Sequence, residues 1–203
     1  MSSVASWGWP ALFLLGAYHG INPGMGWLFA VALGMQEKSS KAVLRALAPI
    51  TLGHAFAVGL AILLAALIQV VLPLSYVQIV VAAALTGLGV FRLVRRRHFA
   101  WGGMQVGFLD LTFWSFLMAS AHGAGLMVLP VVVRLSPEGH HNHGATGVAA
   151  TLLHTLGYLV VTAAVAFLVY RRFGLSLLRR AWINLDLIWA IALILTGCLA
   201  LLA

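Results

Sequence analysis

The first apolar run of the chain, residues 7–34, is long enough to cross a bilayer but is interrupted by residues that suit neither lipid nor a straight helix. The interruption is the stretch Gly16-Ala-Tyr-His-Gly-Ile-Asn-Pro-Gly-Met-Gly-Trp27. Pro23 lacks a backbone donor and disfavours helix at the residue before it. Polar groups in hydrocarbon cost free energy unless they face protein or water. The pattern predicts a broken helix that presents three side chains to an internal cavity: His19, Asn22 and Met25. A kinked helix whose histidine bonds a neighbouring span is the competing interpretation.

Composition points to a membrane protein with several spans. Of the 203 residues, 63% are hydrophobic and only 8% are charged, which excludes an ordinary water-soluble domain. We expect an all-α integral membrane protein with a single transmembrane domain over residues 1–203. The apolar runs predict six transmembrane helices at about 7–34, 46–72, 75–94, 107–134, 146–170 and 181–202. No Lys or Arg precedes the first run, so a cleaved signal peptide is not expected.

The cationic residues are distributed unevenly among the connections between these predicted helices. Eleven of the twelve Lys and Arg lie in or beside the first, third and fifth connections. The second connection has no charge, and the fourth carries only Arg134 and Glu138. By the positive-inside rule the basic connections face the cytoplasm, and both termini are extracytoplasmic. The formal net charge of +8 is therefore a signal of topology, and nucleic acid is not an expected partner.

The two halves of the chain resemble each other. Three short matches recur in the same order at offsets of 103, 100 and 110 residues: His19-Gly20 with His122-Gly123, Thr51-Leu-Gly-His54 with Thr151-Leu-Leu-His154, and Leu85-Thr-Gly87 with Leu195-Thr-Gly197. Chance recurrence of common apolar residues would not place a histidine at corresponding positions in four spans. A copy with three spans must insert in the opposite orientation to the first. The sequence thus predicts two inverted three-helix repeats, residues 7–94 and 107–202, with the first and fourth helices broken near the midplane, as in secondary transporters.

Histidines at membrane depth are the main candidates for a functional site, and there are four: His19, His54, His122 and His154. Ionisable residues at this depth mark functional sites or form hydrogen bonds between helices. Neutral imidazole is a ligand for transition metals, and amide or thioether neighbours alter the softness of such a site. We therefore predict that the four histidines bind a metal ion together with Asn22 and Met25. Apolar packing is the alternative role for this methionine.

The other polar candidates lie nearer to the membrane surfaces. Asp110 and Asp186 are the only carboxylates inside predicted helices, and each is a candidate for proton coupling or for pairing with a nearby arginine. The connection at residues 136–145 contains three histidines within four residues, His140, His141 and His143. Such a tract is typical of metal capture, and a pH-sensing polar loop is the alternative.

Two motifs resemble signatures of the nickel/cobalt transporter (NicO-like) family within the lysine-exporter-like superfamily. The first signature, H-x-x-D-[AP]-D-H, is in register with His19-Gly-Ile-Asn-Pro-Gly-Met25, and the second, L-G-H-S-x-V-V, is similar to Leu52-Gly-His-Ala-Phe-Ala-Val58. The resemblance implies a metal-binding role for His19 and His54. It also implies that two carboxylates and one imidazole of the family pattern are replaced by Asn22, Gly24 and Met25. These replacements remove negative charge and add a soft sulfur, which favours a softer ion such as copper.

The function expected from these features is transport of a transition-metal ion (nickel, cobalt or copper) through a midplane site of His, Asn and Met side chains. Two alternatives are an exporter of small organic cations or amino acids and a non-transporting membrane accessory protein for metalloenzyme assembly. No nucleophile–base pair or cofactor motif is legible, so an enzyme is not expected. The resemblance implies a bacterial-type inner (plasma) membrane as the location. The expected partners are the lipid bilayer, a metal ion or small cation, and a second copy or an accessory membrane subunit.

Overall fold

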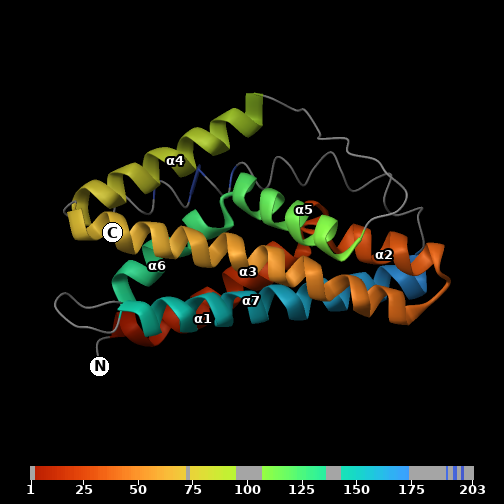
Figure 1. Ribbon diagram of the computed structural model, residues 1–203. Coiled ribbons are helices and arrows are strands. Elements are labelled where there is room, and N and C mark those ends of the chain that lie inside the picture. Colours follow the sequence, from red (N-terminus) through yellow and green to blue (C-terminus); the bar gives the residue numbers. More distant parts are fainter. Residues whose placement is uncertain are drawn as a thin grey trace.

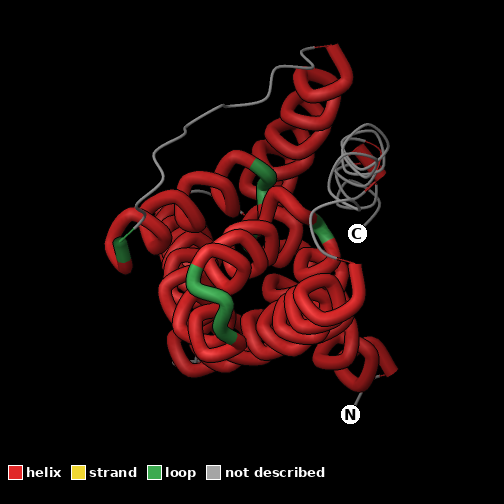
Figure 2. Tube along the Cα trace, turned by 90° about the vertical axis from the view of Figure 1, so that its right-hand side faces the viewer, coloured by secondary structure: helices red, strands yellow, loops and turns green. Residues whose placement is uncertain are grey.

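The computed structural model describes residues 3–71, 74–94, 107–135 and 143–173, together with single positions at 191, 194, 195 and 198. Within these ranges every element is helical and none is a β-strand. The helices lie side by side in an elongated bundle, with α4 Leu74–Val94 at one edge (Figure 1). Figure 2 shows the bundle nearly end-on, with short loops between some of the helices. The all-α prediction is therefore confirmed for the described part of the chain.

The helices occur where the apolar runs predict them. The first predicted span comprises α1 Ser3–Ile21, the 3₁₀ turn η1 Pro23–Met25 and α2 Trp27–Gln36. The elements that follow are α3 Ser40–Val71, α4, α5 Phe108–Ala121, α6 Ala124–Leu135, α7 His143–Leu168 and the π-helical turn η2 Val169–Phe173. The predicted span at 181–202 lies outside the described residues apart from the four single positions.

Two of the described helices are long and apolar enough to cross a membrane, Ser40–Ile68 and Gly144–Arg172, each of 29 residues. The bent pair Phe108–Ala121 and Ala124–Leu135 adds a third if it forms one span. A helix of that length extends about 43 Å, more than the roughly 30 Å of a bilayer's hydrocarbon core. The described residues thus form an all-helical, membrane-associated structure with two or three candidate spans.

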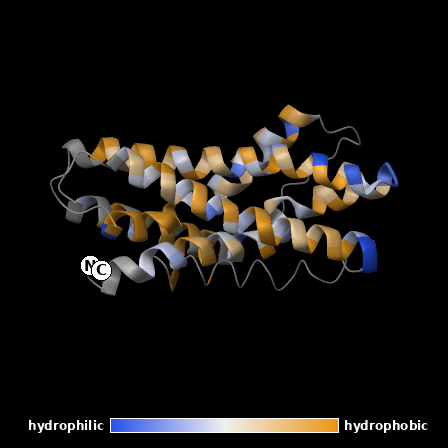
Figure 3. Ribbon diagram, turned by 90° about the horizontal axis from the view of Figure 1, so that it is seen from below, coloured by the Kyte–Doolittle hydropathy of each residue, from blue (hydrophilic) through white to orange (hydrophobic). Residues whose placement is uncertain are grey.

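The long helices turn large apolar side chains outward and bury polar ones. Phe56 of α3 and Leu152 of α7 are 62% and 65% exposed, whereas His54 and His154, two positions along the same helices, are fully buried. Residues two positions apart lie on nearly opposite sides of an α-helix. Figure 3 shows hydrophobic colouring along most of the length of the bundle. An exterior of this kind is solvated by lipid, so the polar residues in the interior are those that need an explanation.

Glycines allow two pairs of helices to approach closely. A Cβ added to Gly16 of α1 would lie 1.9 Å from the carbonyl oxygen of His154, and one added to Gly157 of α7 would lie 2.2 Å from a carbonyl oxygen of α1. Between α3 and α5, a Cβ on Gly53 would lie 2.1 Å from the carbonyl oxygen of Thr112. Small residues of this kind let helix backbones pack together in membranes, where the hydrophobic effect contributes little. The α1–α7 contact, together with the packing of α3 on α7, brings three histidine-bearing helices together.

The first predicted break is present between α1 and α2. Asn22 is extended, with φ −68° and ψ 122°, and its side-chain oxygen accepts a hydrogen bond of 2.8 Å from the amide of Gly24. Gly26 has a φ of 123°, which favours glycine. The indole of Trp27 donates to the carbonyl of Ile21 at 2.9 Å and thereby bridges the two helix ends. Proline and glycine therefore interrupt the helix where the sequence predicts.

The second break lies between α5 and α6. His122 follows the last residue of α5, and Gly123 has a φ of 70°. The two helices are bent by 63° at this point. Because the residue in the left-handed region is a glycine, the chain turns there without the steric cost of a Cβ. Helices are thus interrupted within both apolar runs in which the sequence predicts a break, residues 7–34 and 107–134.

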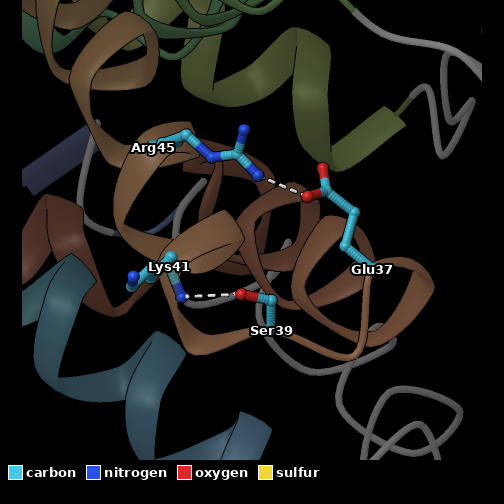
Figure 4. A network of polar contacts seen from close by, with 4 residues as sticks. All are labelled: Glu37, Ser39, Lys41 and Arg45. Atoms are coloured by element: carbon cyan, nitrogen blue, oxygen red, sulfur yellow. Dashed lines mark hydrogen bonds and ion pairs between the residues drawn. The ribbon is translucent and has the colours of Figure 1, made fainter.

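Charged residues gather at one end of the bundle. In the α2–α3 loop Arg45 forms an ion pair with Glu37, and Ser39 accepts a 3.2 Å hydrogen bond from the amide of Lys41 (Figure 4). A Cβ on Gly34 of α2 would lie 3.2 Å from the ring of Tyr170, which places Arg171 and Arg172 of η2 at the same end. Figure 3 shows hydrophilic colouring at this end. Two of the connections predicted to be cytoplasmic therefore share one end of the molecule.

Candidate functional site

Three histidines from three different helices meet in the centre of the bundle. His19 near the end of α1, His54 of α3 and His154 of α7 are all fully buried. Their ring centres are 5.7 Å apart for His19 and His54, 5.1 Å for His19 and His154, and 5.4 Å for His54 and His154. We refer to these three side chains as the histidine cluster. The structure thus brings together three of the four predicted membrane-depth histidines.

Backbone carbonyls of α1 orient two of the rings. The Nδ1 of His19 is 2.7 Å from the carbonyl oxygen of Leu15, and the Nδ1 of His154 is 3.2 Å from that of Leu12. A carbonyl oxygen only accepts, so Nδ1 donates in both cases, and the Nε2 of each neutral ring carries the lone pair. Metal-binding histidines are commonly held in this way, with the second ring N–H bonded to a carbonyl.

The polar atoms of His54 and His154 are not fully satisfied by the protein. Both ring nitrogens of His54 and the Nε2 of His154 are buried and have no hydrogen-bond partner within the described residues. Each buried polar group left without a partner costs about 1–3 kcal/mol. A core position filled for packing alone is normally occupied by an apolar side chain. The unsatisfied nitrogens therefore favour a ligand of the cluster over a packing role.

Tyr158 of α7 connects the cluster to the first break. Its ring stacks on that of His54, with centres 3.9 Å apart and planes 7° from parallel. Its hydroxyl donates a hydrogen bond to the carbonyl oxygen of Met25 in η1. A role for Tyr158 was not predicted from the sequence. Its position one turn after His154, on the same face of the helix, is the signal that points to it.

The separations within the cluster suit one shared ion, but the ring orientations do not. Three imidazoles that bind one metal through nitrogens about 2.0–2.1 Å away have ring centres roughly 5–5.5 Å apart. The rings of His54 and His154 are only 12° from parallel, so lone pairs in their planes do not converge. Accordingly, no group of three His, Cys, Asp or Glu side chains in the described part of the chain is arranged to hold a metal ion. Binding by all three rings requires the imidazole of His54 to turn.

His122, the fourth predicted histidine, lies beside the first break. A Cβ on Gly24 would lie 3.6 Å from its Nε2, and its own Nδ1 is 2.7 Å from the carbonyl oxygen of Met118. The bond repeats that of His19, which also contacts the carbonyl four residues earlier at 2.7 Å. Both histidines precede a helix break. The two positions that match in sequence therefore also match in local geometry.

Asn22 and Met25, the other predicted ligands, have structural roles in η1. The side-chain oxygen of Asn22 caps the turn through Gly24. Met25 is 1% exposed and packs in an apolar cluster with Ile50 and Tyr158. The packing alternative for Met25 therefore agrees with its surroundings.

The remaining candidates lie away from the histidine cluster or outside the described residues. Asp110 is exposed, and its carboxylate accepts a 2.9 Å hydrogen bond from the amide of Gly107 at the start of α5. A carboxylate in the first turn stabilises a helix N-terminus, a role that was not predicted from the sequence. His143 is the first residue of α7. Asp186, His140 and His141 lie outside the described residues.

Comparison with known proteins identifies no relative of this chain. The chain matches no protein-family model, no curated protein and no solved structure. The likeness to nickel/cobalt transporters stays a prediction from the two motifs.

Proposed function

We propose that the protein is a membrane transporter for a transition-metal ion and that the histidine cluster binds the ion on its way across the bilayer. The observation that carries this proposal is the convergence of three fully buried imidazoles from three helices. Neutral imidazole nitrogen is a ligand for copper, zinc, nickel and iron. A bound metal ion would satisfy the unpartnered nitrogens of His54 and His154.

The arrangement of the helices supports transport as well as binding. In inverted-repeat transporters, the site lies between the repeats and beside broken helices. Here α1, the first part of one broken helix, packs on α7, and α5, the first part of the other, packs on α3. Two copies of a three-helix unit related by inversion would produce this exchange of partners. We therefore propose six spans in two inverted repeats, with the cluster at their interface.

The proposed ligands are His19, His54 and His154. They replace the larger predicted set, since Asn22 caps its own turn and Met25 packs among apolar residues. We assign His122 to the second break, where it corresponds to His19 of the first. The motif residues His19 and His54 are thus retained as ligands, and His154 is added from the other repeat.

Metal binding by the purified protein tests the ligand assignment. We expect wild-type protein to bind about one transition-metal ion per chain and His54→Ala and His154→Ala to lose it, because each removes one of three nitrogens. His122→Ala is the matched control, since it removes a buried imidazole outside the cluster, and it should retain the ion. Loss of binding in His122→Ala with retention in the other two variants would contradict the assignment.

Uptake of the same ion into proteoliposomes tests transport. Wild-type protein should move the ion across the membrane, and His54→Ala should not. Binding without uptake would favour the accessory-protein alternative. If no variant and no wild-type preparation binds a transition metal, an exporter of small organic cations becomes the better explanation.

A further inference from the structure

Negative charge is scarce in the whole chain and lies away from the buried interior in its described part. The chain has four acidic residues in total, Glu37, Asp110, Glu138 and Asp186. Of these, the structure describes two, and both are exposed: Glu37 is paired with Arg45 in the α2–α3 loop, and Asp110 caps α5. The described surroundings of the histidine cluster therefore offer lone pairs but no counter-charge.

The charge of the ion determines how much free energy the lack of a counter-charge costs. The solvation free energy lost when an ion leaves water grows with the square of its charge, so a divalent ion loses about four times as much as a monovalent ion of equal size. Coordination by neutral imidazoles restores part of the lost solvation free energy, but it does not neutralise the charge of the ion. A buried divalent ion normally has carboxylates or thiolates among its ligands or brings an anion with it.

We propose that the cargo of the histidine cluster is a monovalent, borderline-to-soft metal ion of the Cu(I) class rather than a divalent ion such as nickel or cobalt. This inference rests on the proposed function. Cu(I) is stable with two or three ligands, which is the number of nitrogens that the cluster supplies, whereas zinc in proteins usually takes four.

Competitive metal binding under anaerobic, reducing conditions tests the charge class. The probes are Cu(I), set by a chelator of known affinity, and Ag(I) as a monovalent ion that does not change oxidation state. Both should bind with a Kd at least about tenfold lower than that of Ni(II), Co(II) or Zn(II). His54→Ala should abolish this binding. Equal or tighter binding of a divalent ion through His54 and His154 would overturn the inference and leave the proposed function standing. No binding of any of these metals would overturn both.

Three variants that remove or add a carboxylate test whether the histidine cluster lacks a counter-charge. Asp186→Asn removes the only carboxylate predicted within a membrane span outside the described residues, and Asp110→Asn is its matched control at the exposed end. We expect both to leave Cu(I) affinity unchanged. Asn22→Asp places a carboxylate three residues after His19 and should lower the Kd for Ni(II) more than that for Cu(I), since the divalent ion gains more from a negative neighbour. The inference would be overturned if Asp186→Asn lost Cu(I) binding while Asp110→Asn kept it. It would also be overturned if the ratio of the Kd for Ni(II) to the Kd for Cu(I) were unchanged in Asn22→Asp.

Discussion

The two ring nitrogens of His54 are buried in the centre of the bundle without a hydrogen-bond partner among the described residues. The ring stacks on that of Tyr158. A phenylalanine would make the same stacking contact without burying unsatisfied nitrogens. An imidazole at this position therefore lowers the stability of the ligand-free protein. Such a cost is common at functional sites and uncommon at positions that serve only packing.

His54→Phe separates these two roles. We expect the variant to unfold at a higher temperature than the wild type, because it removes two unsatisfied nitrogens that each cost about 1–3 kcal/mol. It should bind no metal. Thermal unfolding in detergent and metal analysis provide the two measurements. His122→Phe is the control. It removes an existing hydrogen bond to the carbonyl of Met118, so this variant should be destabilised. A destabilised His54→Phe would indicate a structural histidine.

Tyr158→Phe tests the hydrogen bond that joins the cluster to η1. The variant keeps the stacking on His54 but leaves the carbonyl of Met25 without this donor. We expect the free energy of unfolding to fall by about 0.5–1.5 kcal/mol and metal affinity to change little. Tyr158→Leu removes the stacking as well and should weaken both. If Tyr158→Phe unfolds like the wild type, this hydrogen bond does not stabilise the break.

At the scale of helices, the α1–α7 contact depends on bare backbone at Gly16 and Gly157. The distances of 1.9 and 2.2 Å for an added Cβ are far below van der Waals contact with a carbonyl oxygen. The helices would have to separate to admit even a methyl group. Separation would also move His19 from His154, because the carbonyl that Gly16 faces belongs to His154 itself. Helix packing and site geometry are therefore coupled at one residue.

Gly16→Ala tests the coupling between helix packing and site geometry. Its control is a substitution at a glycine that has space for a side chain. We expect Gly16→Ala to destabilise the protein by about 1–3 kcal/mol, as overpacked sites do, and to reduce metal affinity. A Cβ on Gly87 of α4 would meet nothing within 4 Å. Gly87→Ala should therefore be neutral or stabilise the helix by up to about 1 kcal/mol. Equal stability of the two variants would mean that α1 and α7 do not require close approach.

At the scale of the whole molecule, the features predicted correctly are those encoded by local chemistry. Pro23 identifies the first break because it restricts the backbone at its own position, and the match of His122-Gly123 with His19-Gly20 extends that prediction to the second break. The apolar runs likewise predict α3 and α7. The depth of His54 and His154 follows from their place within those runs.

The features not predicted depend on contacts between helices. The stacking of Tyr158 on His54 joins α7 to α3, and no spacing in the sequence specifies that two helices present these rings to each other. The rotation of each helix also decides which histidines share a cluster. Matching offsets placed His122 and His154 in one set, whereas packing puts His154 in the cluster and His122 beside η1. By contrast, the cap formed by Asp110 could have been predicted from the sequence, because Asp110 lies three residues after Gly107.

The orientation of the chain is testable with two cysteines at positions that are predicted to lie on opposite sides of the membrane. Ser39 lies in the charged α2–α3 loop, and Ser136 lies in the weakly charged connection after α6. By the positive-inside rule, the first should face the cytoplasm and the second the outside. In a background of Cys198→Ser, an impermeant thiol reagent on intact cells should label Ser136→Cys at once and Ser39→Cys only after permeabilisation. The reverse pattern would invert the proposed topology. Labelling of both on intact cells would mean that an even number of spans separates them, which the inverted three-helix repeat does not allow.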